Sequence, residues 1–175
     1  MQDHRYSFEI EATPQEIWQL FWNKRKGQVI EHGNVRIEIL HAGDEHGEGL
    51  IRHCRFPVPR YLLSGGVAYS WEWLTEVKPC ESWRYDAIGK PLWSKASGWT
   101  RLEDLGDGRT RVHFRETYHV FNPIFRFFLE RLVHRAISAD NDQKIKSSIE
   151  LGLAASRAAR GRLEAEAKPG VAASH

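Results

Sequence analysis

The sequence has few of the features that mark reactive, membrane-spanning or metal-binding proteins. Its 175 residues include only two cysteines, Cys54 and Cys80, whose spacing matches no CxxC or other metal-ligand pattern. We expect both thiols to be reduced, with a single disulfide as the alternative. No stretch approaches the roughly 18 apolar residues of a membrane span. The opening residues MQDHRYSFEI lack the apolar core of a signal peptide. These absences predict a cytoplasmic protein without stable membrane insertion.

Charge and motif content exclude further classes of function. The formal net charge is +2, whereas nucleic-acid binding usually needs a clustered basic face, so we expect no nucleic-acid partner. The sequence contains no GxSxG, no P-loop and no GxGxxG that opens a helix, which argues against serine-hydrolase, nucleotide and dinucleotide chemistry. Nine histidines are present without HExxH or another paired helical spacing, so we predict neither a metal site nor a cofactor.

The hydrophobic pattern predicts one domain that begins with a strand, a helix and then a sheet. The length suits a single domain. Apolar and polar residues alternate over residues 6–10, and Thr13, Pro14 and Glu16 carry the signature of a capped helix start. Residues 34–120 alternate with period two between turns such as DLGDGR. Together these segments predict about seven strands, mostly antiparallel because the connections are short.

A long helix is predicted after these strands. Residues 124–155 contain no proline, and their first half places an apolar stripe on one face at about 100° per residue. Ile145 and Ile149 point to roughly the opposite side, so we expect a bend or break near residues 138–142. Residues 1–155 are predicted to form the folded domain, and residues 156–175 a frayed helix end followed by a disordered tail.

The order of these elements resembles the START-like (SRPBCC) superfamily, most closely its bacterial polyketide cyclase/dehydrase family. The resemblance covers about residues 4–153 and rests on FEIEATPQEIWQLF, GEGLIRHCRF, WLTEVKPCESWRYD, LEDLGDGRTRVHF and DNDQKIKSSIE. It implies an α+β helix-grip fold in which a curved antiparallel sheet wraps the long C-terminal helix. It also implies an apolar cavity between sheet and helix that binds lipids, polyketides, sterols or other hydrophobic small molecules. None of these segments is a catalytic signature.

Alternating aromatic residues are the first candidate ligand contacts. They occupy two predicted strands within residues 67–86: Tyr69, Trp71, Trp73, Trp83 and Tyr85. If both aromatic faces point inward, the rings meet across the sheet. They would then either fill the core or stand apart around a cavity, and an outer partner surface is the third alternative. Tyrosine and tryptophan combine a rigid apolar body with one polar group, which suits the wall of a ligand pocket.

The strand over residues 111–120 supplies the candidate acid–base residues. Phe114, Glu116 and Tyr118 share one face with two valines, which marks that face as the inner one. A carboxylate in an apolar setting must be paired or have a raised pKa, so Glu116 is a candidate general acid or base. Its alternatives are a place near the strand end or a bond to an inward arginine, Arg52 or Arg55. Tyr118 is a candidate hydroxyl donor.

The C-terminal helix supplies the remaining candidate contacts. Phe128 and Leu132 lie on its apolar stripe, and Asn141 lies roughly on the side of Ile145. Asn141 either enters the cavity with its amide, marks the bend or meets solvent. The segment 123–137 is more apolar than a one-faced helix needs, with Phe127 off the main stripe, which predicts a lid at the cavity mouth or a contact surface.

Three functions therefore compete. The first is binding of a hydrophobic small molecule without catalysis, by burial of ligand surface and orientation by groups such as Glu116 and Tyr118. The second is an enzyme of the cyclase/aromatase or dehydratase type, in which Glu116 with Tyr118 or an inward arginine moves protons. The third is an interaction module, including a homodimer, that uses the apolar segment 123–137.

Overall fold

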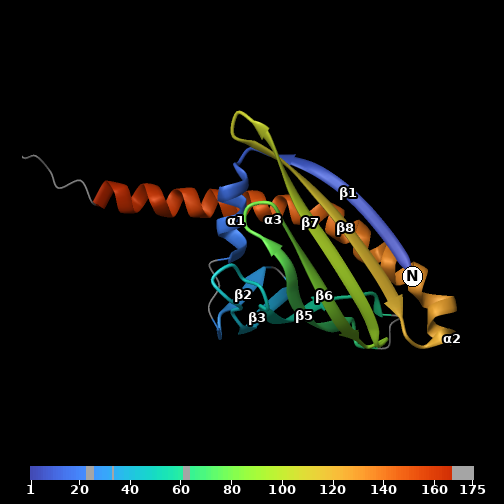
Figure 1. The fold of residues 1–175 in the computed structure, drawn as a ribbon. Coiled ribbons are helices and arrows are strands. Elements are labelled where there is room, and N and C mark those ends of the chain that lie inside the picture. Colours follow the sequence, from blue (N-terminus) through green and yellow to red (C-terminus); the bar gives the residue numbers. More distant parts are fainter. Residues whose placement is uncertain (23–25, 33, 61–63, 167–175) are drawn as a thin grey trace, which may run out of the picture.

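The computed structural model describes residues 1–22, 26–32, 34–60 and 64–166. These residues form an eight-stranded antiparallel sheet that curves around a long helix (Figure 1). The strand order is β1-β8-β7-β6-β5-β4-β3-β2. The strands are β1 (Gln2–Ile10), β2 (Val29–His32), β3 (Val35–His41), β4 (Ile51–Pro57), β5 (Val67–Lys78), β6 (Ser82–Lys90), β7 (Ser94–Gly106) and β8 (Arg109–Val120). The predicted α+β helix-grip architecture is confirmed.

The sheet has eight strands in the described residues, not the predicted seven. The additional strand, β2, has four residues and pairs with β3 at one edge of the sheet. So short a segment gives too little alternation to be recognised from the sequence. The β7–β8 hairpin turns at Asp107 and Gly108, with φ of 54° and 74°. Positive φ at both positions is what the Asp-Gly dipeptide predicts.

Helix α1 (Pro14–Trp22) begins with the predicted capping box. The Thr13 backbone N–H donates to Glu16 Oε2 over 3.0 Å, and the Glu16 N–H donates to Thr13 Oγ1 over 3.3 Å. These bonds satisfy two backbone donors that a helix start leaves unpaired. Ile17 is fully buried. The aromatic rings of the helix pack around Trp83 of β6: Trp18, Phe21 and Trp22.

The C-terminal helix has an irregular start and a continuous body. Asn122 caps a short turn, α2 (Pro123–Phe125), by accepting bonds from two backbone N–H groups. A π-helical turn, η2 (Arg126–Glu130), leads into α3 (Arg131–Glu166), which runs for 36 residues. No break interrupts α3 near residues 138–142, where the sequence predicts a bend or break.

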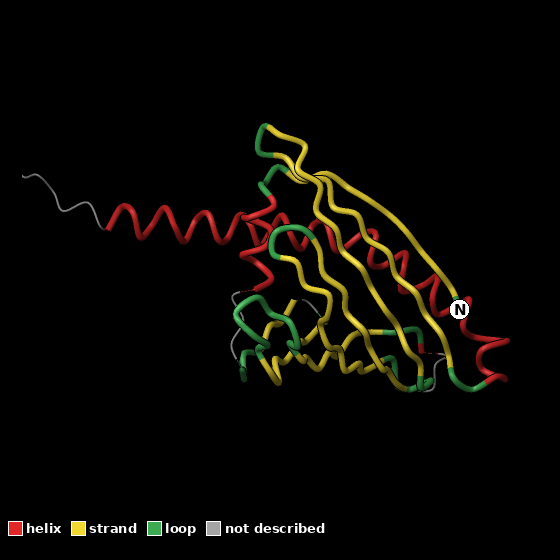
Figure 2. Tube along the Cα trace, viewed as in Figure 1, coloured by secondary structure: helices red, strands yellow, loops and turns green. Residues whose placement is uncertain are grey.

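The contact side of α3 shifts gradually around the helix. Buried and half-buried positions recur at every fourth residue: Val133, Ile137, Asn141, Ile145, Ile149 and Leu153. Because each residue turns the helix by about 100°, four residues overshoot a full turn by about 40°. Contacts at this spacing therefore shift around the helix as it continues. Figure 2 shows α3 passing across the strands.

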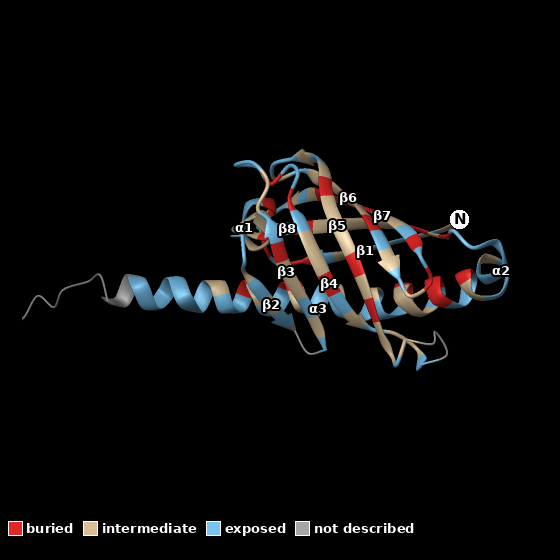
Figure 3. Cartoon of the chain, turned by 90° about the horizontal axis from the view of Figure 1, so that it is seen from below, coloured by how far each residue is buried: buried red, intermediate tan, exposed pale blue. Residues whose placement is uncertain are grey.

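Buried apolar residues form two clusters in the described part of the chain. The larger cluster joins α1, the later part of α3 and the sheet, and includes Ile17, Trp83 and Ile149. The smaller cluster contains Leu92, Val120 and residues near the start of α3. Beyond the sheet, α3 is mostly exposed (Figure 3). The larger cluster is the core of the domain, and the smaller one is a satellite of it.

The chain ends and the cysteines complete the fold. Helix α3 continues to Glu166, and the domain boundary at residue 155 stays a prediction. The tail predicted to be disordered lies outside the described residues from position 167 onward. Cys54 and Cys80 are both free. Within the described ranges, no helix combines the length and apolarity required to cross a bilayer.

Candidate functional site

The inner and outer faces of β5 and β6 follow from their register. Residues directly opposite in an antiparallel pair point to the same side of the sheet. Tyr85 lies opposite Leu74, whereas Trp73 lies opposite Asp86. Tyr85 and Trp73 therefore point to different sides. Leu74 is buried in the larger cluster, which contains residues of α1 and α3, so Tyr85 is on the inner face.

The prediction that Tyr69, Trp71 and Trp73 face inward is wrong. They lie on the outer face, where His53 stacks on Tyr69 and Trp71 with ring centroids 5.7 and 4.8 Å apart. Lys90 Nζ lies 5.2 Å from the Trp71 ring centroid. Stacking and cation–π contacts cover Tyr69 and Trp71, and all three rings are half-buried on the solvent side. The inner side of β5 carries smaller or polar residues: Ala68, Ser70, Glu72 and Leu74.

Glu116 of β8 lies on the inner face as predicted and is 5% exposed. Its Oε1 accepts a hydrogen bond from the Tyr85 hydroxyl over 3.2 Å, and its Oε2 accepts one from the Asn141 amide over 3.1 Å. Burial disfavours the charged carboxylate and raises its pKa above the ordinary value, while these two bonds act in the opposite direction. Asn141 therefore does reach the inner face, and it ties α3 to β8.

An ion pair also lies on the inner face, and only its arginine is a candidate from the sequence. Arg52 of β4 stands directly opposite Glu72 of β5. The Arg52 Nε and Nη2 atoms lie 2.7 and 2.6 Å from Glu72 Oε2, and Ser70 Oγ donates to the other carboxylate oxygen over 2.7 Å. Burial disfavours the charged form of both groups. Their attraction and hydrogen bonds outweigh it, so the Glu72 pKa is lowered and the Arg52 pKa is raised.

These polar side chains form one group, which we call the inner polar belt: Arg52, Ser70, Glu72, Tyr85, Glu116 and Asn141. The Arg52 guanidinium lies 5.9 Å from the Tyr85 ring centroid, which links its two halves. The belt separates the two apolar clusters. Along β8, Val112 belongs to the larger cluster and Tyr118 to the smaller, with Glu116 between them. Asn141 occupies the same intermediate place along α3.

The ion pair of the belt is enclosed by protein but still partly accessible to solvent. The Arg52 and Glu72 side chains remain 26% and 14% exposed. Nevertheless, desolvation is the largest single influence on the pKa of each group. A side chain on a convex surface is well hydrated, whereas one on a concave wall is surrounded by protein while still reaching solvent. Arg52 and Glu72 are therefore surrounded by protein while part of each side chain still reaches solvent.

The other inward aromatic residues differ in burial and in the rings that they contact. Trp83 is buried among the rings of α1 and is a core residue. Phe114 is half-buried next to Tyr6 of β1, with ring centroids 5.1 Å apart. Tyr118 is buried and stacks on His134 of α3, with ring centroids 6.2 Å apart. All three face inward, as the alternation predicts.

The prediction that Phe128 and Leu132 face the sheet is wrong. Phe128 is 65% exposed and Leu132 is 54% exposed. The turn that contains Phe128 is π-helical, so a stripe calculated for a regular α-helix is shifted there. Leu132 precedes the buried Val133, and the contact side of α3 begins at Val133. Both residues point away from the inner polar belt.

Three buried polar atoms beside the belt have no hydrogen-bond partner in the described structure. They are the Tyr6 hydroxyl, His134 Nε2 and Ser138 Oγ, from β1 and α3. His4 connects two of them, with ring centroids 5.5 Å from Tyr6 and 6.3 Å from His134. Buried polar atoms normally find a partner. Unpaired hydroxyl and imidazole groups here offer donors and acceptors to a polar group of a ligand.

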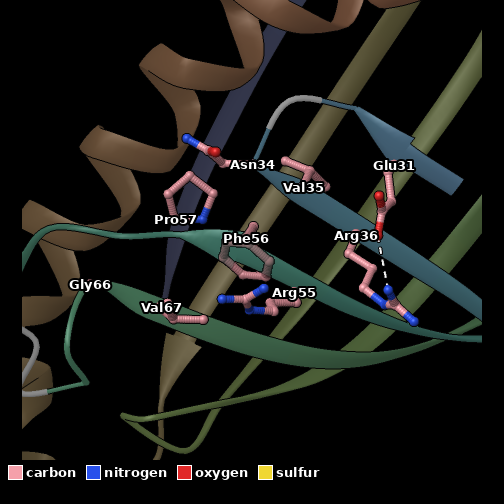
Figure 4. Close-up of a pocket in the computed structure, with 9 residues that line it drawn as sticks. All are labelled: Glu31, Asn34, Val35, Arg36, Arg55, Phe56, Pro57, Gly66 and Val67. Atoms are coloured by element: carbon pink, nitrogen blue, oxygen red, sulfur yellow. Dashed lines mark hydrogen bonds and ion pairs between the residues drawn. The ribbon is translucent and has the colours of Figure 1, made fainter.

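A pocket of about 450 Å³ opens at the ends of strands β2–β5 (Figure 4). Val35 and Phe56 line it and belong to the inner-facing positions of β3 and β4. Phe56 lies two positions beyond Cys54 and four beyond Arg52 on the same face of β4. The rim is charged, and Arg36 pairs with Glu31 over 2.9 Å. The pocket therefore lies along the strand that leads to the inner polar belt.

Solved structures with this arrangement of strands and helix are known. A protein from Thermus thermophilus matches with a TM-score of 0.65 and 17% identity, covering 89% of this chain and 99% of that chain. The Zhui aromatase/cyclase from Streptomyces matches with a TM-score of 0.60 and 16% identity, covering 85% and 93%. A START superfamily protein from Mycobacterium smegmatis matches with a TM-score of 0.58 and 11% identity, covering 85% and 97%.

The chain has a START-like fold. No family model and no curated protein matches the sequence. Sequence identities this low show a shared fold and not a shared chemistry. The function is therefore inferred from the residues of the inner polar belt. Among the described residues, no three His, Cys, Asp or Glu side chains come together as a metal-binding group.

Proposed function

We propose that this START-like protein binds a hydrophobic small molecule, of the lipid or polyketide-like kind, between the sheet and α3. The inner polar belt carries the proposal. It interrupts the apolar interior with a carboxyl group, an amide, a phenol and an ion pair, some of which remain reachable. A closed structural core would gain stability from apolar residues at these positions, because buried polar groups are costly even when they are paired.

The proposed ligand has an apolar body and at least one hydroxyl or carbonyl group. Its body would lie against Phe114 and the inner apolar residues, and each Å² of apolar surface removed from water contributes roughly 25 cal/mol. Its polar group would bond to Glu116, Tyr85 or the unpaired atoms of Tyr6 and His134. Arg52 favours a ligand oxygen that carries partial or full negative charge.

A cyclase- or dehydratase-type enzyme is the second candidate, because Glu116 combines a raised pKa with a hydroxyl neighbour. A carboxyl whose pKa is raised holds a proton nearer neutral pH and can donate or accept it during a reaction. Tyr85, rather than the predicted Tyr118, is the phenol in contact with Glu116. The fold shared with the Zhui aromatase/cyclase is compatible with this candidate.

The test compares two tyrosines on opposite faces of one sheet. Native mass spectrometry of the protein as purified would reveal a retained apolar molecule. Binding of the fluorescent dye ANS, and its displacement by oleate, would then be measured for the wild type, Tyr85→Phe and Tyr69→Phe. We expect Tyr85→Phe to weaken oleate binding by roughly threefold to tenfold, the usual effect of losing one hydrogen bond. The outer-face control Tyr69→Phe should bind as the wild type does.

Equal effects of the two tyrosine variants, or no binding of dye or oleate, would contradict ligand binding between the sheet and α3. Glu116→Gln separates the two candidates once a substrate is known. Under the enzyme hypothesis, this variant keeps affinity and loses turnover, because glutamine has nearly the same shape but cannot carry the proton.

A further inference from the structure

An apolar surface at one end of the molecule has no role in the proposed ligand site. We call it the end patch, and it consists of Phe121, Ile124, Phe125, Phe127, Phe128 and Leu132, all exposed. Phe127 alone is 82% exposed. Trp93 adds a seventh large side chain from the β6–β7 turn, where its carbonyl accepts a hydrogen bond from the Phe121 N–H over 3.1 Å. In Figure 1, α2 projects beyond the sheet at this end. A soluble monomer rarely exposes so many large apolar side chains together.

The polar groups of this segment hold its apolar side outward. The Glu130 side chain is buried, and its Oε2 accepts a bond from the Val120 N–H over 2.9 Å. Its Oε1 lies 3.2 Å from the amino group of Met1. The Arg126 guanidinium donates to the carbonyl oxygens of Val120 and Phe121 over 2.9 and 3.0 Å. An amphipathic surface helix normally turns its apolar side to the core. Here the fixed contacts are polar, and the phenylalanines face solvent.

The exposed charged side chains of residues 117–139 are positive. Between Thr117 and Ala139 the sequence has one acidic residue, Glu130, which is engaged in the buried contacts. Arg131 and Arg135 of α3 and Lys95 of β7 are exposed at the same end. A two-fold dimer through this surface would bring arginines of both copies together without acidic partners. A basic rim around a projecting apolar surface instead suits a deformable layer of anionic headgroups over hydrocarbon.

We propose that the end patch docks the protein reversibly onto anionic lipid membranes. Phe127, Phe128 and Trp93 would enter the boundary between headgroups and acyl chains, while Arg131 and Arg135 contact anionic headgroups. This docking is peripheral and needs no spanning helix. The inference does not depend on the ligand site, because it rests on different residues at the outer surface.

Vesicle flotation tests the proposal with the full chain. Vesicles of pure phosphatidylcholine and vesicles containing phosphatidylglycerol would be compared for the wild type, Phe127→Ser and the double change Arg131→Gln with Arg135→Gln. We expect the wild type to float with anionic vesicles and to be released by salt. Phe127→Ser should weaken binding by roughly tenfold or more, the usual scale for losing one inserted aromatic side chain. The double arginine change should remove the preference for anionic lipid.

Matched controls lie at the other end of α3. Leu163→Ser and Arg160→Gln alter an exposed leucine and an exposed arginine far along the same helix, and both should float as the wild type does. Phe127→Trp should retain binding, with a blue-shifted tryptophan emission in the presence of vesicles. Absence of flotation by the wild type would overturn the proposal. So would a concentration-dependent dimer in sedimentation that Phe127→Ser disrupts without any vesicle binding.

Discussion

The contact between Tyr85 and Glu116 depends on a residue without a side chain. Gly98 of β7 lies directly opposite Tyr85. A Cβ atom built on Gly98 would overlap the Tyr85 ring. The ring can therefore lie across β7 and reach the Glu116 carboxyl only because the neighbouring strand is bare at that point. The sequence shows a glycine inside a strand, but it does not show which ring lies over it.

Gly98→Ala should therefore destabilise the fold and disturb the inner polar belt. We expect a loss of about 1–3 kcal/mol, the usual cost of forcing extra volume into a packed site. Urea denaturation measures the loss. The control is Gly161→Ala in α3, where no atom outside the helix lies within 4 Å. It should stabilise by up to about 1 kcal/mol, because alanine favours helix. Equal stability of the Gly98 variant and the wild type would mean that the Tyr85 ring moves aside freely.

Alternation along a strand shows which residues share a face but not which face is inner. On β8 the predicted inner face is correct, because two valines lie on the same face as Phe114, Glu116 and Tyr118. On β5 the largest rings lie outside, packed with His53 and Lys90 from neighbouring strands. No property of residues 67–78 alone could reveal those partners. Facing charges at Arg52 and Glu72 would have signalled the ion pair, but the register that pairs them is not readable from either strand.

At the level of elements, local signals were the most reliable. The capping box of α1 involves residues three apart, so it could be predicted from the sequence and is present in the structure. The winding contact of α3 involves partners far along the chain, in α1 and the sheet. From the helix sequence alone, this change of contact side resembles a break in the helix. The π-helical turn η2 leaves no distinct sequence signal, and for this reason Phe128 was assigned to the wrong side.

The capping box allows a prediction about α1. Thr13→Ala removes the side-chain acceptor for the Glu16 N–H and should lower the unfolding free energy by about 1 kcal/mol. Chemical denaturation measures this change. Gln15→Ala, an exposed change in the first turn of the same helix, is the control and should have little effect. A Thr13 variant as stable as the wild type would show that Glu16 and its contact with Arg157 hold the helix start alone.

At the level of the whole molecule, Glu116 makes stability depend on pH in a defined direction. Because its pKa is raised in the folded state, the protonated form is the one that folding favours. That contribution is complete below the unfolded-state pKa and is lost as the pH rises through the folded-state pKa. Glu72 has a lowered pKa and acts in the opposite sense. Its ion pair with Arg52 is common to the wild type and to a Glu116 variant, and its repulsion of Glu116 is one cause of the raised Glu116 pKa.

Glu116→Gln should therefore gain stability relative to the wild type as the pH rises. The unfolding free energies of both proteins would be measured between about pH 5 and about pH 8, and their difference should change on the order of 1 kcal/mol in favour of the variant at high pH. A difference that stays constant over this range, or that moves in favour of the wild type, would contradict the raised pKa.

The continuous helix α3 fixes the distance between the end patch and the inner polar belt. Arg131, beside the end patch, and Asn141, in the inner polar belt, lie on one rigid element, and at a rise of 1.5 Å per residue their axial separation is about 15 Å. With the end patch against lipid headgroups, the belt would stand at that depth behind them. A molecule passing from the lipid layer to Glu116 would have to span this distance. The spacing along α3 would therefore select ligands by the length of the ligand, independently of any single contact.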